Sequence, residues 1–518
     1  MTEGQKKLEC DVLVVGGGIN GAGVARDAAG RGLCVVLCEK DDLAAHTSSA
    51  STKLIHGGLR YLEHYEFGLV RKALIEREVL LRAAPHIMWP LRFVMPHDQG
   101  QRPAWMIRAG LFLYDHLGRR ELLAGSQGID LRRHVAGRPL KPEFTRGFMY
   151  SDGWVDDARL VVLNAMDAAE KGARIFTHTA CVAAVRDGGR WQATLRQDGG
   201  GGDIGVGARC IVNAAGPWAG HFLQDAARQP PDHVVRLIKG SHIVVRRLFE
   251  HDHAYIFQHP DGRIVFAIPY EQDYTLVGTT DIEYHGDAGK VGITVDEIDY
   301  LCALTSRYFR KAIVPADVVW SYSGVRPLVE DAASAASEVT RDYRLEFDTR
   351  GAPMLSIFGG KITTFRKLAE EAVDLIGPAL SNPGPGWTAG KCLPGGDLFG
   401  ETPSNQSVRE FGAFVEGMQN KYHWLPAALV ARYARAYGTR IGVLLAKRNG
   451  LADMGEEIAA GLYGAEVDYL MRHEWAACAA DVLWRRSKLG LHLPAGTAQK
   501  LDRWIAARHA KVEPARIF

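Results

Sequence analysis

The sequence predicts an α/β protein with a Rossmann-like βαβ dinucleotide-binding domain, an antiparallel-sheet substrate domain and a C-terminal helical domain. Three observations predict this fold class. A glycine-rich turn joins an apolar run to a small-residue helix near the N-terminus, short β-rich runs follow one another over 233–325, and the chain beyond Gly396 shows amphipathic helical spacing. A length of 518 residues also suits about three domains of roughly 150 residues each.

The composition is that of a globular protein. Hydrophobic residues make up 47% and charged residues 24%, which excludes a disordered or fibrous chain. The 62 basic and 60 acidic residues give a net charge of +2, so a nucleic-acid partner is not expected. The eight cysteines have neither a zinc spacing nor a Cys-x-x-Cys pair. No signal peptide or spanning segment is evident, so we expect buried thiols in a reducing cytosol and no metal site.

The first element is a βαβ unit. The apolar runs 11–15 and 33–37 predict two buried strands, and 22–29 predicts the helix between them. Gly16-Gly17-Gly18-Ile19-Asn20-Gly21 precedes the helix and Glu39 follows the second strand. Gly16 suits a tight turn, Gly18 the approach of a pyrophosphate and Gly21 close packing, while Glu39 suits ribose hydroxyls. The pattern predicts a dinucleotide site but does not by itself separate FAD from NAD.

Three later segments favour a flavin over a nicotinamide. A hydroxyl-rich loop at 47–53 leads into 54–61, a strand at 210–212 ends in Asn-Ala-Ala-Gly-Pro-Trp, and 357–364 contains Gly-Gly-Lys and opens a helix that runs through 369–375. A nicotinamide enzyme would seldom return to its nucleotide domain in this way. The remaining patterns predict a hairpin turn at 199–202 and an antiparallel sheet that includes 242–245, 263–268 and 275–278.

Together these segments resemble the FAD-dependent glycerol-3-phosphate dehydrogenases of the aerobic, membrane-associated type, within the D-amino-acid-oxidase-like flavoproteins. The resemblance spans 11–518, and its most specific stretches are 48–66, 239–245, 322–328 and 358–364. Two others, 472–475 and 481–486, resemble the family's C-terminal helical domain. The resemblance implies an FAD-binding domain at 10–85, 146–232 and 322–382, a substrate domain at 86–145 and 233–321, a linker at 383–396 and a helical domain at 397–518.

The resemblance also implies which residues bind FAD, which we expect to be noncovalent. A helix that begins near Gly359 would aim its N–H groups, together with Lys361, at the pyrimidine ring and stabilise the charge that reduction places there. The expected cofactor-binding residues are Gly16, Gly18, Gly21, Glu39, Thr47, Ser48, Ser49, Ser51, Lys53, His56, Gly57, Gly58, Ala215, Gly216, Trp218, Gly359, Gly360, Lys361, Ile362 and Thr363.

The implied substrate, sn-glycerol 3-phosphate, requires cations for its phosphate and a base for its C2 hydroxyl. Arginine matches phosphate in a bidentate way. We therefore expect the substrate to contact Arg60, Tyr61, Arg326, Arg341 and Lys361, although Asp342 offers Arg341 a structural ion pair instead. The expected catalytic residues are His56, Arg326 and Lys361. His56 is the preferred base because imidazole titrates near the working pH, and His242 is its rival.

Residues 101–140 carry seven arginines against three acids, with apolar stretches at 105–107 and 111–114. Such a segment can lie in an anionic membrane interface, although a buried helix or a dimer face explains the apolar half equally well. The resemblance favours peripheral attachment to the cytoplasmic face of the inner membrane, with ubiquinone or menaquinone as electron acceptor. Whether the chain forms a homodimer is left open.

The predicted function is FAD-dependent oxidation of sn-glycerol 3-phosphate to dihydroxyacetone phosphate by hydride transfer to flavin. In this function the electrons pass to a membrane quinone of the respiratory chain. Two alternatives remain. The first is a flavin oxidase or dehydrogenase of another small anion that uses oxygen or another acceptor. The second is a flavin-bearing protein that modifies or binds RNA, which the balanced net charge does not favour.

Overall fold

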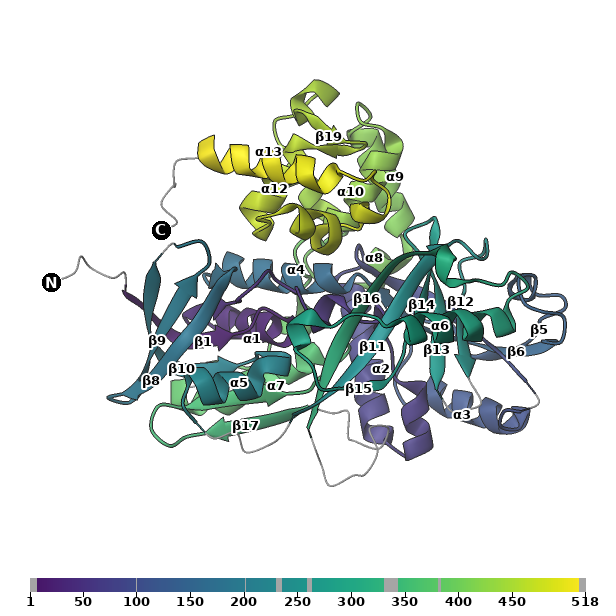
Figure 1. Cartoon of the computed structure of the whole chain (residues 1–518), viewed down its shortest axis with the longest axis horizontal. Helices are drawn as coiled ribbons and strands as arrows, with labels where there is room; N and C mark the ends of the chain where they lie inside the picture. Colours follow the sequence, from purple (N-terminus) through teal and green to yellow (C-terminus); the bar gives the residue numbers. More distant parts are fainter. Residues whose placement is uncertain are drawn as a thin grey trace.

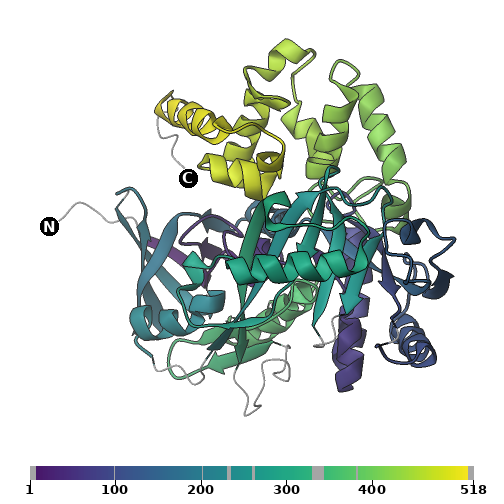
Figure 2. The same cartoon turned by 45° about the vertical axis from the view of Figure 1, so that its right-hand side comes forward.

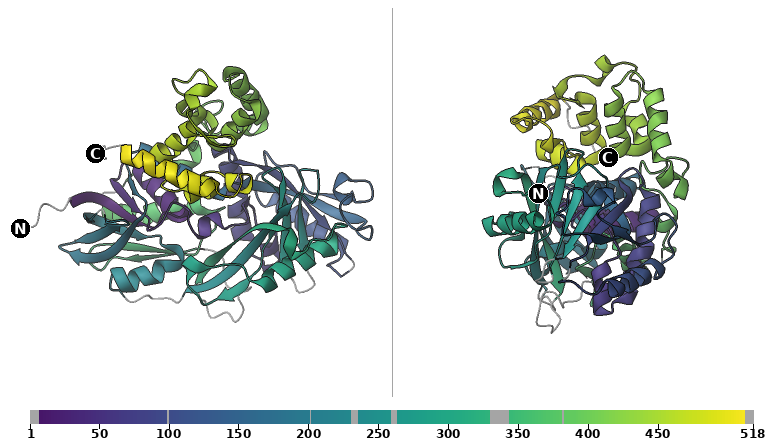
Figure 3. Two further views of the ribbon diagram at one scale, coloured as in Figure 1. Left: turned by 45° about the horizontal axis from the view of Figure 1, so that its top comes forward. Right: turned by 90° about the vertical axis from the view of Figure 1, so that its right-hand side faces the viewer.

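The structure is a computed structural model that describes residues 7–98, 100–200, 202–229, 235–258, 263–329, 343–380 and 383–511. Two sheets lie side by side, and a helical domain from the C-terminal part of the chain packs against them (Figure 1). Turned views show this domain as a separate layer above both sheets (Figures 2 and 3). Among the described residues, no helix is long and apolar enough to cross a bilayer.

Within the described residues the first sheet has eight strands, in the order β17–β18–β10–β1–β2–β7, with β9 and β8 continuing from β10. β1 pairs in parallel with β2 and β10, and β10 in parallel with β18. Their apolar runs are buried on both faces, as expected for parallel strands covered on both sides. The strands are β1 (Lys7–Val15), β2 (Val35–Cys38), β7 (Arg174–Phe176), β8 (Thr179–Asp187), β9 (Arg190–Gln197), β10 (Asp203–Asn213), β17 (Arg344–Asp348) and β18 (Met354–Phe358).

Helices cover one face of this sheet. α1 (Ile19–Gly30), α4 (Asp157–Glu170) and α7 (Phe365–Ile376) share a buried core with Val12 and Val14 of β1. The opposite face, which includes Leu13, packs against Trp191 of β9 and Phe222, which follows α5 (Ala219–His221). The predicted strand, helix and strand are therefore confirmed as β1, α1 and β2. The predicted hairpin turn joins the antiparallel strands β9 and β10.

The second sheet has ten strands among the described residues, in the order β15–β11–β14–β13–β12–β4–β6–β3, with β16 beside β11 and β5 beside β6. The three predicted runs are confirmed in β11, β13 and β14, which pair in an antiparallel way. The strands are β3 (Leu54–Ile55), β4 (Met88–Pro96), β5 (Gln127–Asp130), β6 (Arg146–Val155), β11 (Val235–Arg246), β12 (Ala254–Gln258), β13 (Ile264–Tyr270), β14 (Tyr274–Gly278), β15 (Ile282–Tyr284) and β16 (Val318–Val329).

Three helices flank the second sheet, and some of its strands come from ranges that we expected in the FAD-binding domain. α6 (Val295–Tyr308) covers one face, whereas α2 (Phe67–Ala83) and α3 (Ala104–His116) share a core with β4 and β6. We expected 146–155 and 322–329 in the FAD-binding domain. Instead, β6 pairs along its length with β4, and β16 pairs with β11. Backbone pairing between distant segments places both strands in the second sheet, and no local motif reports such pairing.

The C-terminal domain is helical, as predicted, with a small hairpin added. Its own buried core includes Val430, Tyr433 and Leu470. The expected linker packs on the first sheet's layer, because Trp387 Nε1 donates to the Asp27 carbonyl at 3.1 Å. The elements are α8 (Asn405–Arg409), α9 (Phe411–Lys421), α10 (Ala427–Tyr437), α11 (Ile441–Leu444), β19 (Glu457–Ala459), β20 (Leu462–Tyr463), α12 (Gly464–Glu474), the π-helical turn η12 (Asp481–Arg486) and α13 (Thr497–Lys511).

Candidate cofactor and active site

A cavity of about 400 Å³ opens at the carboxyl ends of the parallel strands β1, β2 and β10. Ligands of open α/β sheets bind at this edge. Many of the predicted cofactor-binding residues line the cavity, and they come from segments far apart in the chain: Gly16, Gly18, Glu39, Thr47, Ser48, Ala215, Gly216, Trp218, Gly359 and Gly360. The structure therefore brings together the segments on which the flavin prediction rested.

The turn between β1 and α1 has the shape that a phosphate group requires. Gly16 has φ +112°, and a Cβ atom at this position would lie 2.4 Å from the Ala214 carbonyl oxygen. α1 begins at Ile19, whose N–H donates to Ser48 Oγ at 3.0 Å. The hydroxyl-rich loop thus reaches the helix N-terminus, where N–H groups and the helix dipole favour an anion.

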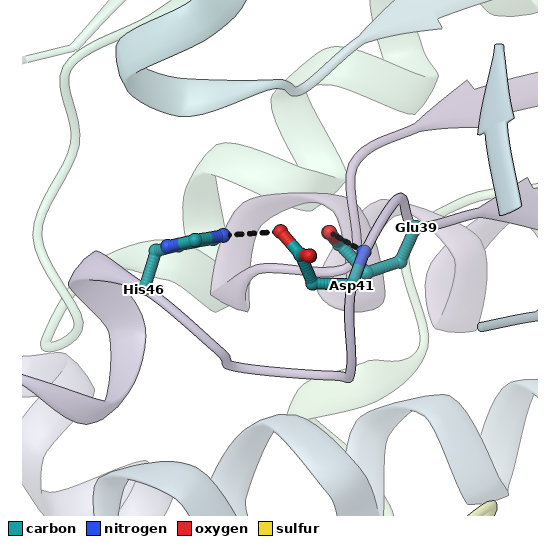
Figure 4. Close-up of side chains that lie close together, drawn as sticks. All are labelled: Glu39, Asp41 and His46. Atoms are coloured by element: carbon teal, nitrogen blue, oxygen red, sulfur yellow. Dashed lines mark hydrogen bonds and ion pairs between the residues drawn. The ribbon is translucent and has the colours of Figure 1, made fainter. Parts of the chain in front are cut away.

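Glu39 stands at the end of β2 with its carboxylate held by backbone donors. It accepts from Gly17 N at 2.6 Å and from Asp41 N at 2.9 Å. Burial raises its pKa. Beside it, His46 Nε2 lies 2.6 Å from Asp41 Oδ2, and this hydrogen bond lowers the pKa of Asp41 (Figure 4). Because the loop after β2 is fixed in this way, the Glu39 side chain keeps one position at the cavity wall.

Trp218 is held against the same loop. The His46 ring lies 4.6 Å from its ring, and Lys40 Nζ lies 3.6 Å from its ring centroid. Both His46 and Lys40 line the cavity, as does Asn20, whose Nδ2 donates to the Gly359 carbonyl at 3.1 Å. Sequence reasoning did not single out these three residues. The one available signal was their position beside residues of the predicted motifs.

The hydroxyl-rich loop divides between two environments. Thr47 and Ser48 line the cavity. Ser49 Oγ donates to the His46 carbonyl at 3.2 Å. Ser51 Oγ and Lys53 Nζ instead donate to the carboxylate of Asp157, at 2.7 and 2.8 Å, and Lys53 is 1% exposed. The ammonium of Lys53 is therefore engaged in a buried ion pair at the start of α4.

The glycines at 359 and 360 do not begin a helix, which corrects the expected position of the helix N-terminus. Gly359 has φ +72° and Gly360 φ +99°, values that a right-handed helix cannot contain. A turn follows, and α7 begins at Phe365. Lys361 therefore lies in the turn between a left-handed segment and the helix.

This turn meets the segment that contains the candidate base. The His56 N–H donates to Thr363 Oγ1 at 3.2 Å, and Lys361 Nζ lies 3.8 Å from the centroid of the Tyr61 ring. Ile362 packs against the core of the first sheet. The structure thus joins 56–61 to 361–363, directly after Gly359 and Gly360 of the cavity wall.

The residues that follow His56 in the chain are also held by specific contacts. Gly57 N–H donates to the Tyr114 hydroxyl at 2.8 Å. Gly58 has φ +76° and caps the short helix η2 (Leu59–His64), on which the half-buried Arg60 lies beside Tyr61. The remaining predicted cation, Arg341, lies outside the described residues.

The second sheet supplies Arg326 and His242. Arg326 Nη1 donates to Asp281 Oδ1 at 2.9 Å, which sets the direction of its guanidinium. His242 is 1% exposed, its Nε2 lies 3.0 Å from Thr52 Oγ1, and its ring stacks on that of Tyr322 at 4.7 Å. Desolvation, followed by the nearby positive charges, lowers the pKa of His242 well below 6.5. Its imidazole is therefore neutral across the physiological range.

Comparison with known proteins identifies this architecture. Residues 11–366 match the family model described as FAD dependent oxidoreductase, and 387–511 match the C-terminal domain of alpha-glycerophosphate oxidase. The chain belongs to the FAD-dependent oxidoreductase family. FAD is thus its cofactor, and the predictions of family, fold class and cofactor are confirmed.

Relatives and solved structures agree with this membership. A glycerol-3-phosphate dehydrogenase from Pseudomonas aeruginosa is 54% identical over 96% of this chain and 95% of its own. A D-erythritol 1-phosphate dehydrogenase from Brucella abortus is 50% identical over 96% of this chain and 97% of its own. The FAD complex of a glycerol-3-phosphate dehydrogenase from Bacillus halodurans superposes with a TM-score of 0.77 at 27% identity, covering 99% of this chain and 92% of that one.

The residues around the cavity fit FAD. The Gly16–Gly18 turn lets the two phosphates approach the backbone at the N-terminus of α1, and the buried carboxylate of Glu39 can accept from the hydroxyls of a ribose. Lys361 and Thr363, which follow Gly359 and Gly360 of the cavity wall, are the groups for the ring system. These residue roles are predictions that rest on position and chemistry.

Proposed function

We propose that this flavoprotein oxidises sn-glycerol 3-phosphate to dihydroxyacetone phosphate. One observation carries the proposal. The backbone N–H of His56 is bonded to Thr363 and Lys361 lies over the Tyr61 ring, so the segments 56–61 and 361–363 meet next to Gly359 and Gly360 of the FAD cavity. The names of the relatives support the same substrate class, because each describes a dehydrogenase of a polyol phosphate.

In the proposed reaction the protein holds the phosphate and removes one proton. Arg326, directed by Asp281, together with Arg60 and Lys361, supplies positive charge for the phosphate dianion. His56 accepts the proton of the C2 hydroxyl as the C2–O bond becomes a carbonyl. FAD, when bound, supplies the two-electron acceptor for the C2 hydride.

The acceptor of the second half-reaction is proposed to be a membrane quinone, and α3 the membrane contact. α3 projects from the second sheet at the side away from the C-terminal domain (Figure 1). Trp105 is 69% and Phe112 60% exposed on it, and Met106 and Leu113 are also exposed. Large apolar side chains beside arginines suit the interface of an anionic bilayer. α3 also reaches the active site, since Tyr114 accepts from Gly57 N.

The proposed substrate is tested by anaerobic reduction. We expect purified holoenzyme to be yellow and to bleach promptly when sn-glycerol 3-phosphate is added without oxygen. Arg326→Ala should keep its flavin spectrum but bleach far more slowly, because the phosphate loses a fixed cation. D-erythritol 1-phosphate serves as the competing substrate. A protein that stays oxidised with glycerol 3-phosphate and bleaches with the erythritol compound would assign the longer polyol phosphate instead.

The membrane contact is tested by flotation with vesicles that contain an anionic lipid. Trp105→Glu with Phe112→Glu should abolish co-flotation while leaving anaerobic bleaching intact. Val295→Glu is the matched control, because Val295 is 72% exposed at the start of α6, away from α3. Unchanged flotation of the α3 variant, together with a loss of dimers in sedimentation, would make this face a subunit contact.

A further inference from the structure

Two arginines of the C-terminal domain converge on one buried carboxylate beside the FAD cavity. Asp42 is 1% exposed and lies in the loop between β2 and η1 (Thr47–Ser49). Arg486 Nη1 and Nη2 donate to its two oxygens at 2.6 and 2.7 Å, and Arg485 Nε donates at 2.5 Å. A bidentate guanidinium fixes a carboxylate in both position and orientation. Nearly the whole length of the chain separates the two partners.

The loop that Asp42 anchors forms one wall of the FAD cavity. The segment 39–48 begins at Glu39 and ends at Thr47 and Ser48, all of which line the cavity. Its middle rests on the phosphate-binding turn, since Ala44 N donates to the Gly17 carbonyl at 3.2 Å and Leu43 is fully buried. Movement of Asp42 would therefore shift the residues that face both the ribose and the phosphates.

Arg486 is itself held in place from its own domain. It is fully buried, and its Nε and Nη2 donate to the Glu474 carbonyl at 2.9 and 2.5 Å. The Glu474 side chain in turn accepts from Arg159 of α4, with Nη2 at 3.0 Å from Oε1. The end of α12 is thus tied to the FAD-binding domain, and it sets the direction of the Arg486 fork toward Asp42.

We propose that Arg486 is a positioning residue for FAD, and that the C-terminal helical domain completes the FAD site through it. Arg486 holds Asp42, and Asp42 holds the segment 39–48 against the Gly16–Gly18 turn. A wall that is already ordered costs less conformational entropy when the cofactor binds. The C-terminal domain therefore contributes to FAD affinity without touching FAD.

The test measures the release of FAD from diluted holoenzyme by the rise of flavin fluorescence. Arg486→Lys keeps the charge but removes the fork, so FAD should leave at least about tenfold faster, a factor that corresponds to about 1.4 kcal/mol. Asp42→Asn should produce the same loss, and combining the two changes should add little. Excess FAD should restore the visible circular dichroism of the bound flavin.

Arg432→Lys is the matched control. Arg432 forms a similar fork with Glu466, at 2.7 Å to each oxygen, but inside the C-terminal domain. Its variant should lose thermal stability and still release FAD within about twofold of the wild-type rate, since that fork does not reach the cavity. Equal release from Arg432→Lys and Arg486→Lys, or wild-type release from Arg486→Lys and Asp42→Asn, would overturn the proposal.

Discussion

The two candidate bases, His56 and His242, differ in how deeply they are buried. His242 is packed between Tyr322 and Thr52, and its burial keeps the imidazole neutral. His56 is half-buried and lies in the segment that meets Thr363. A general base must reach the proton it abstracts. A half-buried residue in the segment that meets 361–363 satisfies that requirement better than a ring enclosed within a sheet.

Replacing each histidine by asparagine separates their roles. We expect His56→Asn to slow anaerobic flavin reduction by glycerol 3-phosphate by about a hundredfold or more, the usual contribution of a general base. His242→Asn should slow it by less than about tenfold, because this change disturbs packing rather than proton transfer. Stopped-flow absorbance measures both rates at matched FAD content. A larger loss in His242→Asn would assign the base to His242.

Individual site residues were predictable where a local motif demanded one residue type. Gly16 and Glu39 were found in this way, and both line the cavity. His46 and Asn20 were missed because their roles arise from Trp218 and Gly359, which lie far away in the chain. Lys53 shows that a motif can also suggest a contact that the folded chain uses differently. Its motif position indicated cofactor contact, but its ammonium lies against Asp157, a partner that only the folded chain supplies.

At the scale of elements, period and composition predicted the strands and helices, but not how distant segments pair. The run 146–155 has the pattern of a buried strand, yet its membership of the second sheet depends on β4. The start of α7 was placed too early because Gly359 and Gly360 were treated as a helix N-terminus. Their positive φ values instead make a left-handed turn that precedes the helix.

A buried histidine in the turn between α2 and β4 makes the stability of the folded protein depend on pH. His86 is fully buried there, and desolvation, assisted by Arg159 and Arg435, lowers its pKa to about 3. Between pH 6.5 and about 3 the unfolded chain binds a proton that the folded chain does not. This histidine therefore destabilises the folded state progressively as the pH falls below about 6.5.

The change His86→Gln should remove that contribution. We expect the variant to lose less stability than wild type on acidification from pH 6.5 to 4.5, by up to about 1.4 kcal/mol for each pH unit. Denaturant unfolding at several pH values measures the difference, and carboxylates that titrate in both proteins cancel. Parallel stability curves for the two proteins would show that His86 does not bind its proton in this range.

At the scale of the whole molecule, both buried and exposed ion pairs join the C-terminal domain to the rest of the protein. Arg159 and Glu474 form a pair with side chains 1% and 0% exposed. Arg440 and Glu170 form another across the same boundary, where Glu170 is 47% exposed. A buried charge that loses its partner is strongly destabilising, whereas an exposed pair contributes little. Of these two pairs, the buried one at the start of α4 therefore holds the domain more firmly.

Matched changes at these two pairs test that view. Arg159→Leu leaves the Glu474 carboxylate buried without its ion pair, so we expect a loss of about 3–5 kcal/mol in the free energy of unfolding. Arg440→Leu should cost about 1 kcal/mol or less, because water can solvate Glu170. Guanidinium unfolding followed by tryptophan fluorescence measures both. Combining Arg159→Leu with Glu474→Leu should recover part of the loss, since no charge then stays buried. Similar losses in the two single variants would mean that the exposed pair holds the domain as firmly as the buried one.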